Sequence, residues 1–156
     1  MNEKRELLRH TLATLAYRAA RALNGAPEGF AGFDGVGRQP VELLAHIGDL
    51  FDWALSAAEG QERWHVANPL EWAEEQARFF GTLRAFDAYL TSEATVHVSI
   101  EGIMQGPVAD ALTHVGELAM MRMLAGSPTR VVNFFVAAVA VGQVGAEQPV
   151  PVQPFK

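Results

Sequence analysis

Apolar residues recur at alternating spacings of three and four along four stretches of this chain, and this pattern constrains the fold more than any other feature. The first stretch covers about residues 4–23 and ends at Asn24-Gly25, a pair typical of helix C-termini. Its apolar stripe consists of Leu12, Leu15, Ala16, Ala19 and Leu23. One face of this helix is therefore expected to lie in a core.

The second and third stretches carry clear signals for the start of a helix. Pro40 suits the first position of a helix that ends near Glu59-Gly60. Asn68 is a typical N-cap residue, and Pro69 suits the first position of the third helix. The second helix is expected to bury Leu43, Ile47, Leu50, Ala54 and Ala57 or Ala58. The third helix presents a seam of Trp72, Gln76, Phe79, Leu83, Phe86 and Leu90. Each of these helices is predicted to bury one face against a neighbour.

The fourth helix is expected to begin at Gly106-Pro107 and to run to Ala125, before Gly126. Residues 95–100 alternate with a period near two, which predicts a short extended segment ahead of this helix. Residues 131–141 are apolar and form either a last helix or an extended strap. Residues 25–38 contain five glycines and one proline, and a loop of this length is able to cross the bundle or cover a site.

These elements predict an all-α fold, a four-helix bundle with a long first loop and an irregular C-terminal segment. The length of 156 residues and the hydrophobic content of 49% suit one domain, which we place at residues 1–145. Residues 146–156 are expected to form a proline-rich tail, because the prolines there preclude regular structure.

Composition excludes several classes of function. The net charge of −6 and the scattered basic residues argue against a nucleic-acid partner. The chain has no cysteine, which excludes disulfides, thiolate metal sites and a cysteine nucleophile. No stretch is long and apolar enough to span a membrane, and the charged first residues do not resemble a signal peptide. We therefore expect a cytoplasmic protein without a membrane partner.

The fourth predicted helix places three ionisable residues on one narrow stripe. At about 100° per residue, His114 lies about 40° from Asp110, and Glu117 lies about 20° from it on the other side. Met121 and Leu124 continue the same stripe, and the other faces of the helix are also largely apolar. Since a helix that is apolar all round is normally buried, these ionisable groups are expected to need one another or a cation as partners.

A metal ion would meet this need. Asp110 and His114 are four residues apart, so both can reach one ion from a single helix, and His46 borders the apolar stripe of the second helix. Two histidines and a carboxylate suit Zn²⁺, Fe²⁺ or Ni²⁺ and leave positions open for water or substrate. Three further carboxylates are candidates for orienting a ligand or serving as general base: Glu117, Asp49 and Glu42.

The same residues also allow an interpretation without metal. Asp110 and His114 would then form a buried ion pair, and His46 would be hydrogen-bonded to the backbone. In this alternative the chain is a catalytically silent bundle, acting as a dimeric scaffold or as a small-molecule binding protein.

Three segments resemble the DinB-like (YfiT-type) metalloenzyme family. The segment from Leu112 to Pro128, with His114-Val-Gly-Glu117 near its start, resembles that family's last core helix, which carries H-x-x-x-H-R-G-Q and ends at a glycine. Residues 41–49, which include His46, are similar to its second helix, whose histidine is the first ligand. The stretch from Asn133-Phe-Phe-Val to Gly145 is similar to its C-terminal segment.

This resemblance implies a four-helix bundle, usually dimeric, that holds a divalent metal ion with three histidines. His46 and His114 match two of the ligand positions, and Asp110 stands where the family has its remaining histidine. The resemblance further implies a metal-dependent transferase or hydrolase that acts on a small molecule, in some relatives together with a low-molecular-weight thiol. Zn, Ni or Fe is the expected metal, and a homodimer is the expected assembly.

Overall fold

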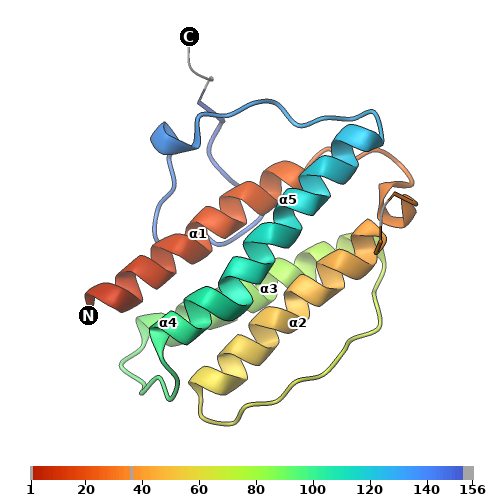
Figure 1. Cartoon of the computed structure of the whole chain (residues 1–156). Helices are drawn as coiled ribbons and strands as arrows, with labels where there is room; N and C mark the ends of the chain where they lie inside the picture. Colours follow the sequence, from red (N-terminus) through yellow and green to blue (C-terminus); the bar gives the residue numbers. More distant parts are fainter. Residues whose placement is uncertain (1, 36, 153–156) are drawn as a thin grey trace.

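The structure, a computed structural model, describes residues 2–35 and 37–152, and this part of the chain is all-α (Figure 1). Four long helices form the bundle, namely α1 (Glu3–Leu23), α2 (Pro40–Ala58), α3 (Trp72–Thr91) and α5 (Ala109–Leu124). α2 packs against α3 and α5, and α1 packs against the same two helices. The four helices therefore enclose one core, in which α1 lies diagonal to α2. The predicted all-α class with four packed helices is confirmed, and the described residues contain no strand.

The core is built from the stripes that the sequence predicts. All five stripe residues of α1 are buried, as are those of α2. On α3, the fully buried seam residues are Phe79, Leu83, Phe86 and Leu90. Burying one such side chain contributes about 1.5–3 kcal/mol, so the shared apolar faces are the main reason why these helices pack. None of the described helices combines the length and the apolar character needed to cross a membrane.

The predicted start of α3 is wrong by three residues. Asn68 and Pro69 do not begin the helix, which starts at Trp72. Instead, the carboxylate of Glu75, itself buried, accepts a hydrogen bond from the backbone N–H of Leu70 at 2.9 Å. Because side chains of the bundle hold residues 59–71 in an irregular path, the local cap signal at Asn68 has no effect.

The last core helix is preceded by a short helix that the sequence does not predict. A short helix, α4 (Ile100–Ile103), is capped by the Ser99 hydroxyl and continues through a wide turn, Met104–Val108, into α5. This turn contains Pro107 and places Gly106 at φ −93° and ψ −105°. The non-helical backbone at Gly106 separates the two helices, so the predicted start of the last core helix at Gly106-Pro107 agrees with the position of this kink. Residues 95–99 are irregular and pair with no strand among the described residues, so the predicted extended segment forms no sheet.

α5 is also less buried than its apolar composition predicts. Its buried residues face the bundle, whereas the side chains of Met120, Met123 and Leu124 are more than half exposed. The reason is geometric, because the long helices that pack along α5 are α1 and α2, and both lie on the same side of it.

Residues 127–152 form a strap that runs back along α1 (Figure 1). One 3₁₀ turn, Phe134–Val136, interrupts it, so of the two predicted forms the extended strap is the one observed. The strap is anchored by Val144, which is buried in the core, and by the Arg18 guanidinium, which lies 3.8 Å from the Phe134 ring centroid. The predicted tail, residues 146–156, is described as far as Val152 and is irregular there.

Gly60 ends the turn after α2 with φ +77°, a conformation that side chains with a Cβ rarely adopt. A Cβ at this position would lie 2.9 Å from Cγ of His97. We expect Gly60→Ala to destabilise the fold by about 1 kcal/mol more than Gly25→Ala, because overpacking adds to backbone strain. Gly25 has a similar φ of +69° and open space around it, so it is the matched control. Urea denaturation of both variants measures the difference, and equal losses would contradict the role of His97.

Candidate metal centre

His46 from α2 and Asp110 and His114 from α5 lie together, as the sequence predicts. Their ligand atoms all lie within 4.8 Å of one another. Nε2 of His46 is 3.7 Å from one oxygen of Asp110, and Nε2 of His114 is 3.4 Å from the other. Two ligands that each lie about 2.1 Å from one tetrahedral ion are about 3.4 Å apart. The triad therefore has the spacing of a site that can hold a metal ion.

Glu117 determines which nitrogen of His114 faces the triad. Nδ1 of His114 lies 3.1 Å from a carboxylate oxygen of Glu117. Because a carboxylate oxygen accepts hydrogen bonds, Nδ1–H is the donor in this contact. Nε2 is then the ring nitrogen that faces the Asp110 carboxylate, 3.4 Å away. Such a carboxylate–histidine pair orients the ring and raises its basicity at metal sites.

The surroundings of His46 favour its neutral form. Burial lowers the pKa of His46 below its ordinary value, and the nearby charges of Arg38 and His114 lower it further, against the opposing effect of Asp110. The ring of Trp64 lies edge-on, with its centroid 6.1 Å from that of His46. A neutral imidazole is the form that binds a metal ion.

The two histidines of the triad border a pocket of about 530 Å³, which is large enough for a small molecule. The side chains of His46, His114 and Glu117 lie on one part of its wall. The remainder is mostly apolar and comes from Leu43, Met120, Met121 and Leu124, with Gly37 and Arg38 of the first loop. The long loop thus reaches this pocket, which agrees with the expectation that it covers a site.

The ionisable stripe of α5 is not buried, contrary to the prediction. The side chains of Asp110 and Glu117 are 48% and 44% exposed, whereas that of His114 is 17% exposed. The large desolvation penalty that a buried stripe would carry is therefore absent. The two carboxylates instead reach solvent, so a metal ion held beside Asp110 would keep access to water.

Comparisons with protein-family models, with curated proteins and with solved structures find no match. The family of the chain is thus not identified, and the geometry of the site is the basis for assigning its chemistry.

Of the three carboxylates expected to assist the triad, Glu117 contacts one of its histidines. The structure gives the other two different partners. Glu42 accepts a hydrogen bond from the backbone N–H of Gln39 in the capping box that begins α2. Asp49 is buried and accepts hydrogen bonds from the Ala67 backbone and from the Arg78 guanidinium.

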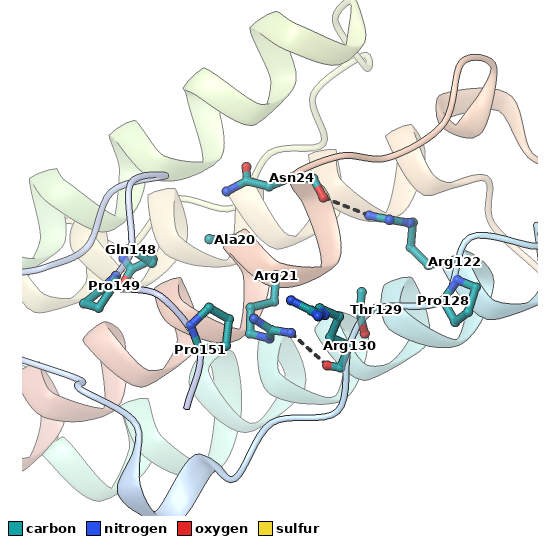
Figure 2. Close-up of a pocket in the computed structure, with 10 residues that line it drawn as sticks. All are labelled: Ala20, Arg21, Asn24, Arg122, Pro128, Thr129, Arg130, Gln148, Pro149 and Pro151. Carbon is teal, nitrogen blue, oxygen red and sulfur yellow. Dashed lines mark hydrogen bonds between the residues drawn. The ribbon is translucent and has the colours of Figure 1, made fainter. Parts of the chain in front are cut away.

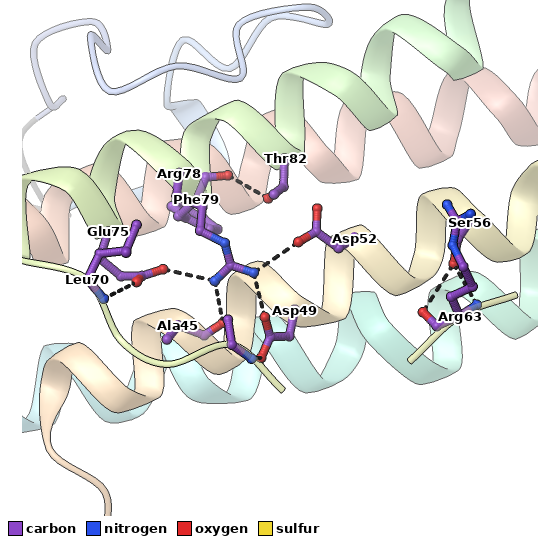
Figure 3. A network of polar contacts seen from close by, with 11 residues as sticks. Ala45, Asp49, Asp52, Ser56, Arg63, Leu70, Glu75, Arg78, Phe79 and Thr82 are labelled. Carbon is purple, nitrogen blue, oxygen red and sulfur yellow. Dashed lines mark hydrogen bonds and ion pairs between the residues drawn. The ribbon is translucent and has the colours of Figure 1, made fainter. Parts of the chain in front are cut away.

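A second group of potential ligands, Asp49, Asp52 and His65, also lies within 4.8 Å. Here, however, a cation of the protein is already present, because the Arg78 guanidinium pairs with both aspartates (Figure 3). The same guanidinium contacts Glu75 at 3.0 Å, and it also donates to the Ala45 carbonyl. These acidic neighbours raise the pKa of Arg78 despite its partial burial. The arginine therefore neutralises this group, and we assign it no metal.

Two residues in these sites were missed by reasoning from the sequence. Arg78 lies three residues after Glu75 on the third helix, a spacing that indicates an ion pair, but its partners on the second helix carry no such signal. Arg38 belongs to a glycine-rich loop, whose path across the pocket no periodicity determines.

Proposed function

We propose that the chain binds a divalent metal ion through His46, Asp110 and His114 and acts as a metal-dependent transferase or hydrolase on a small molecule. The observation that carries this proposal is the convergence of three ligand atoms within 4.8 Å beside a pocket. Two imidazoles and one carboxylate match the donors that Zn²⁺, Ni²⁺ and Fe²⁺ prefer. Three protein ligands leave a position for water or substrate, as in catalytic rather than structural sites.

The alternative without metal is a catalytically silent bundle whose triad is an ion-pair network. That interpretation pairs Asp110 with His114 and gives the His46 ring a hydrogen bond to the backbone. Among the described residues the His46 ring makes no such hydrogen bond, and its Nε2 instead lies 3.7 Å from Asp110. The half-exposed carboxylate of Asp110 also contributes little as an ion-pair partner in water. These two observations favour the metal-binding proposal.

The resemblance to DinB-like metalloenzymes supports the reaction class. A bound ion of this kind lowers the pKa of a coordinated water or thiol. The chain itself supplies the other parts of such a site. Glu117 holds the His114 ring in place, and the apolar pocket wall binds the uncharged part of a substrate while it excludes water.

Metal retention by the untagged full chain tests the proposal. The protein is stripped with a chelator, dialysed separately against Zn²⁺, Ni²⁺ and Fe²⁺, and analysed for bound metal. We expect about one ion per chain and a higher unfolding temperature with at least one of these metals, because binding stabilises the folded state. Mg²⁺ is the control, since it prefers oxygen ligands and should not be retained. If none of the three transition metals is retained, the proposal is wrong.

A further inference from the structure

A second pocket, which shares no residue with the one beside the triad, lies between the end of α1 and the strap (Figure 2). Its volume is about 300 Å³. Three arginines line it, and no aspartate or glutamate is found among its described lining residues. The complete lining is Ala20, Arg21, Asn24, Arg122, Pro128, Thr129, Arg130, Gln148, Pro149 and Pro151.

Arg122 is a buried cation without a carboxylate partner. All five of its N–H groups donate to oxygens of the chain, namely the carbonyls of Ala22, Asn24 and Gly25 and the carbonyl and hydroxyl of Ser127. The guanidinium thus caps the end of α1, where the helix dipole places about half a negative charge. The α5 C-terminus lies at the same place, so the charge of Arg122 offsets the negative ends of both helix dipoles and these carbonyls do not repel an anion.

Arg21 and Arg130 face the same pocket with most of their donors unused. One N–H of Arg21 donates to the Arg130 carbonyl at 2.7 Å. Among the described residues, the Arg130 guanidinium has no hydrogen-bond or ion-pair partner, and neither arginine pairs with a carboxylate. An adjoining pocket repeats the pattern, because Arg21, Thr129 and Arg130 line it together with Arg18.

This concentration of positive charge contrasts with the rest of the molecule. The chain carries a net charge of −6, whereas this cavity is lined by three arginines and, among the described residues, by no carboxylate. Like charges gathered around one cavity repel one another, and this repulsion is relieved when an anion enters. The geometry therefore calls for an anionic ligand with more than one charge.

We propose that this pocket binds a phosphate group, either as free phosphate or as the phosphate of a small ester. Arg21 and Arg130 would donate to its oxygens, because a guanidinium offers paired donors that match a phosphate. The Thr129 hydroxyl would add a further donor, and Arg122 would supply fixed positive charge without a direct contact. The site is independent of the metal triad.

Isothermal titration of the full chain with inorganic phosphate and with glycerol phosphate tests this proposal at constant ionic strength. The double variant Arg21→Gln/Arg130→Gln is expected to weaken binding at least about tenfold, since hydrogen bonds to charged groups contribute that much each. The matched control is Arg63→Gln/Arg84→Gln, which removes the same charge from exposed positions outside the pocket. This control is expected to bind like the unchanged protein. The probe that binds with the higher affinity shows whether the pocket prefers free phosphate or a phosphate ester.

The single variant Arg130→Gln guards against loss of the fold, because this exposed side chain has no described hydrogen-bond partner. It should still weaken binding severalfold while the unfolding temperature of the free protein is unchanged. Three results would overturn the proposal: no binding of either probe, equal weakening in the control variant, or equally strong binding of acetate. The last two would indicate a nonspecific response to charge.

Discussion

Replacing Arg78 by methionine is expected to lower the free energy of unfolding by about 3–5 kcal/mol, because two buried carboxylates would lose the cation that pairs with them. Asp49 is 2% exposed and Glu75 is fully buried, and both pair with this guanidinium (Figure 3). Methionine retains most of the aliphatic volume, so the loss reports on charge rather than on a cavity. Urea denaturation measures the free energy, and an unchanged m-value would show that the native and unfolded states keep their compactness.

Arg84→Met is the matched control for this prediction. Arg84 lies on the same helix but is exposed, and it makes no described ion pair, so its replacement should change stability by less than about 0.5 kcal/mol. Arg78→Lys should lower the free energy of unfolding by less than Arg78→Met does, but it should not restore the original stability. A compact ammonium group cannot donate to Asp49, Asp52 and Glu75 at the same time, as the planar guanidinium does. A loss below about 1 kcal/mol in Arg78→Met would show that the network does not hold buried charges in solution.

The four helices were predictable because each carries a long apolar stripe whose period is intrinsic to the α-helix. α1 and α2 agree with their predicted limits to within one or two residues, since Asn24-Gly25 and Pro40 act through the local backbone. The start of α3 was mispredicted because a tertiary contact overrides the local signal there. The Asp49 carboxylate on α2 accepts a hydrogen bond from the Ala67 backbone N–H, 18 residues further along the chain, so no short window of sequence contains this contact.

The triad was predictable for a different reason. A spacing of four residues places Asp110 and His114 on the same face of a helix, whatever surrounds that helix. His46 borders the apolar stripe of the second helix, and this position indicated that the second helix supplies the remaining ligand. Burial was mispredicted because composition does not reveal how many neighbours a helix has, and α5 is covered on one side. The pocket wall from the first loop depends on the path of residues 24–39, which no periodic pattern determines.

Loss of one imidazole from the triad is expected to have the largest effect on metal binding. His114→Ala should lower the affinity for Zn²⁺ by more than about 100-fold, since even residues that only orient a ligand contribute about 10–100-fold. The fold should survive, because the ring lies at the pocket wall and outside the hydrophobic core. Equilibrium dialysis gives the affinity, and circular dichroism of the metal-free variant verifies that the helices are retained.

His10→Ala is the control, since His10 is an exposed histidine of α1 outside the triad and its removal should leave Zn²⁺ affinity unchanged. Asp110→His provides the complementary test, because it places a third histidine where the resembling family has one and should preserve Zn²⁺ binding. Asp110→Ala, by contrast, removes a ligand and should weaken binding to the same degree as His114→Ala. If Asp110→Ala binds Zn²⁺ as tightly as the unchanged chain, the carboxylate is no ligand and the site rests on two histidines alone. If His114→Ala binds normally while its stability falls, the triad is an ion-pair network and the metal-binding proposal is wrong.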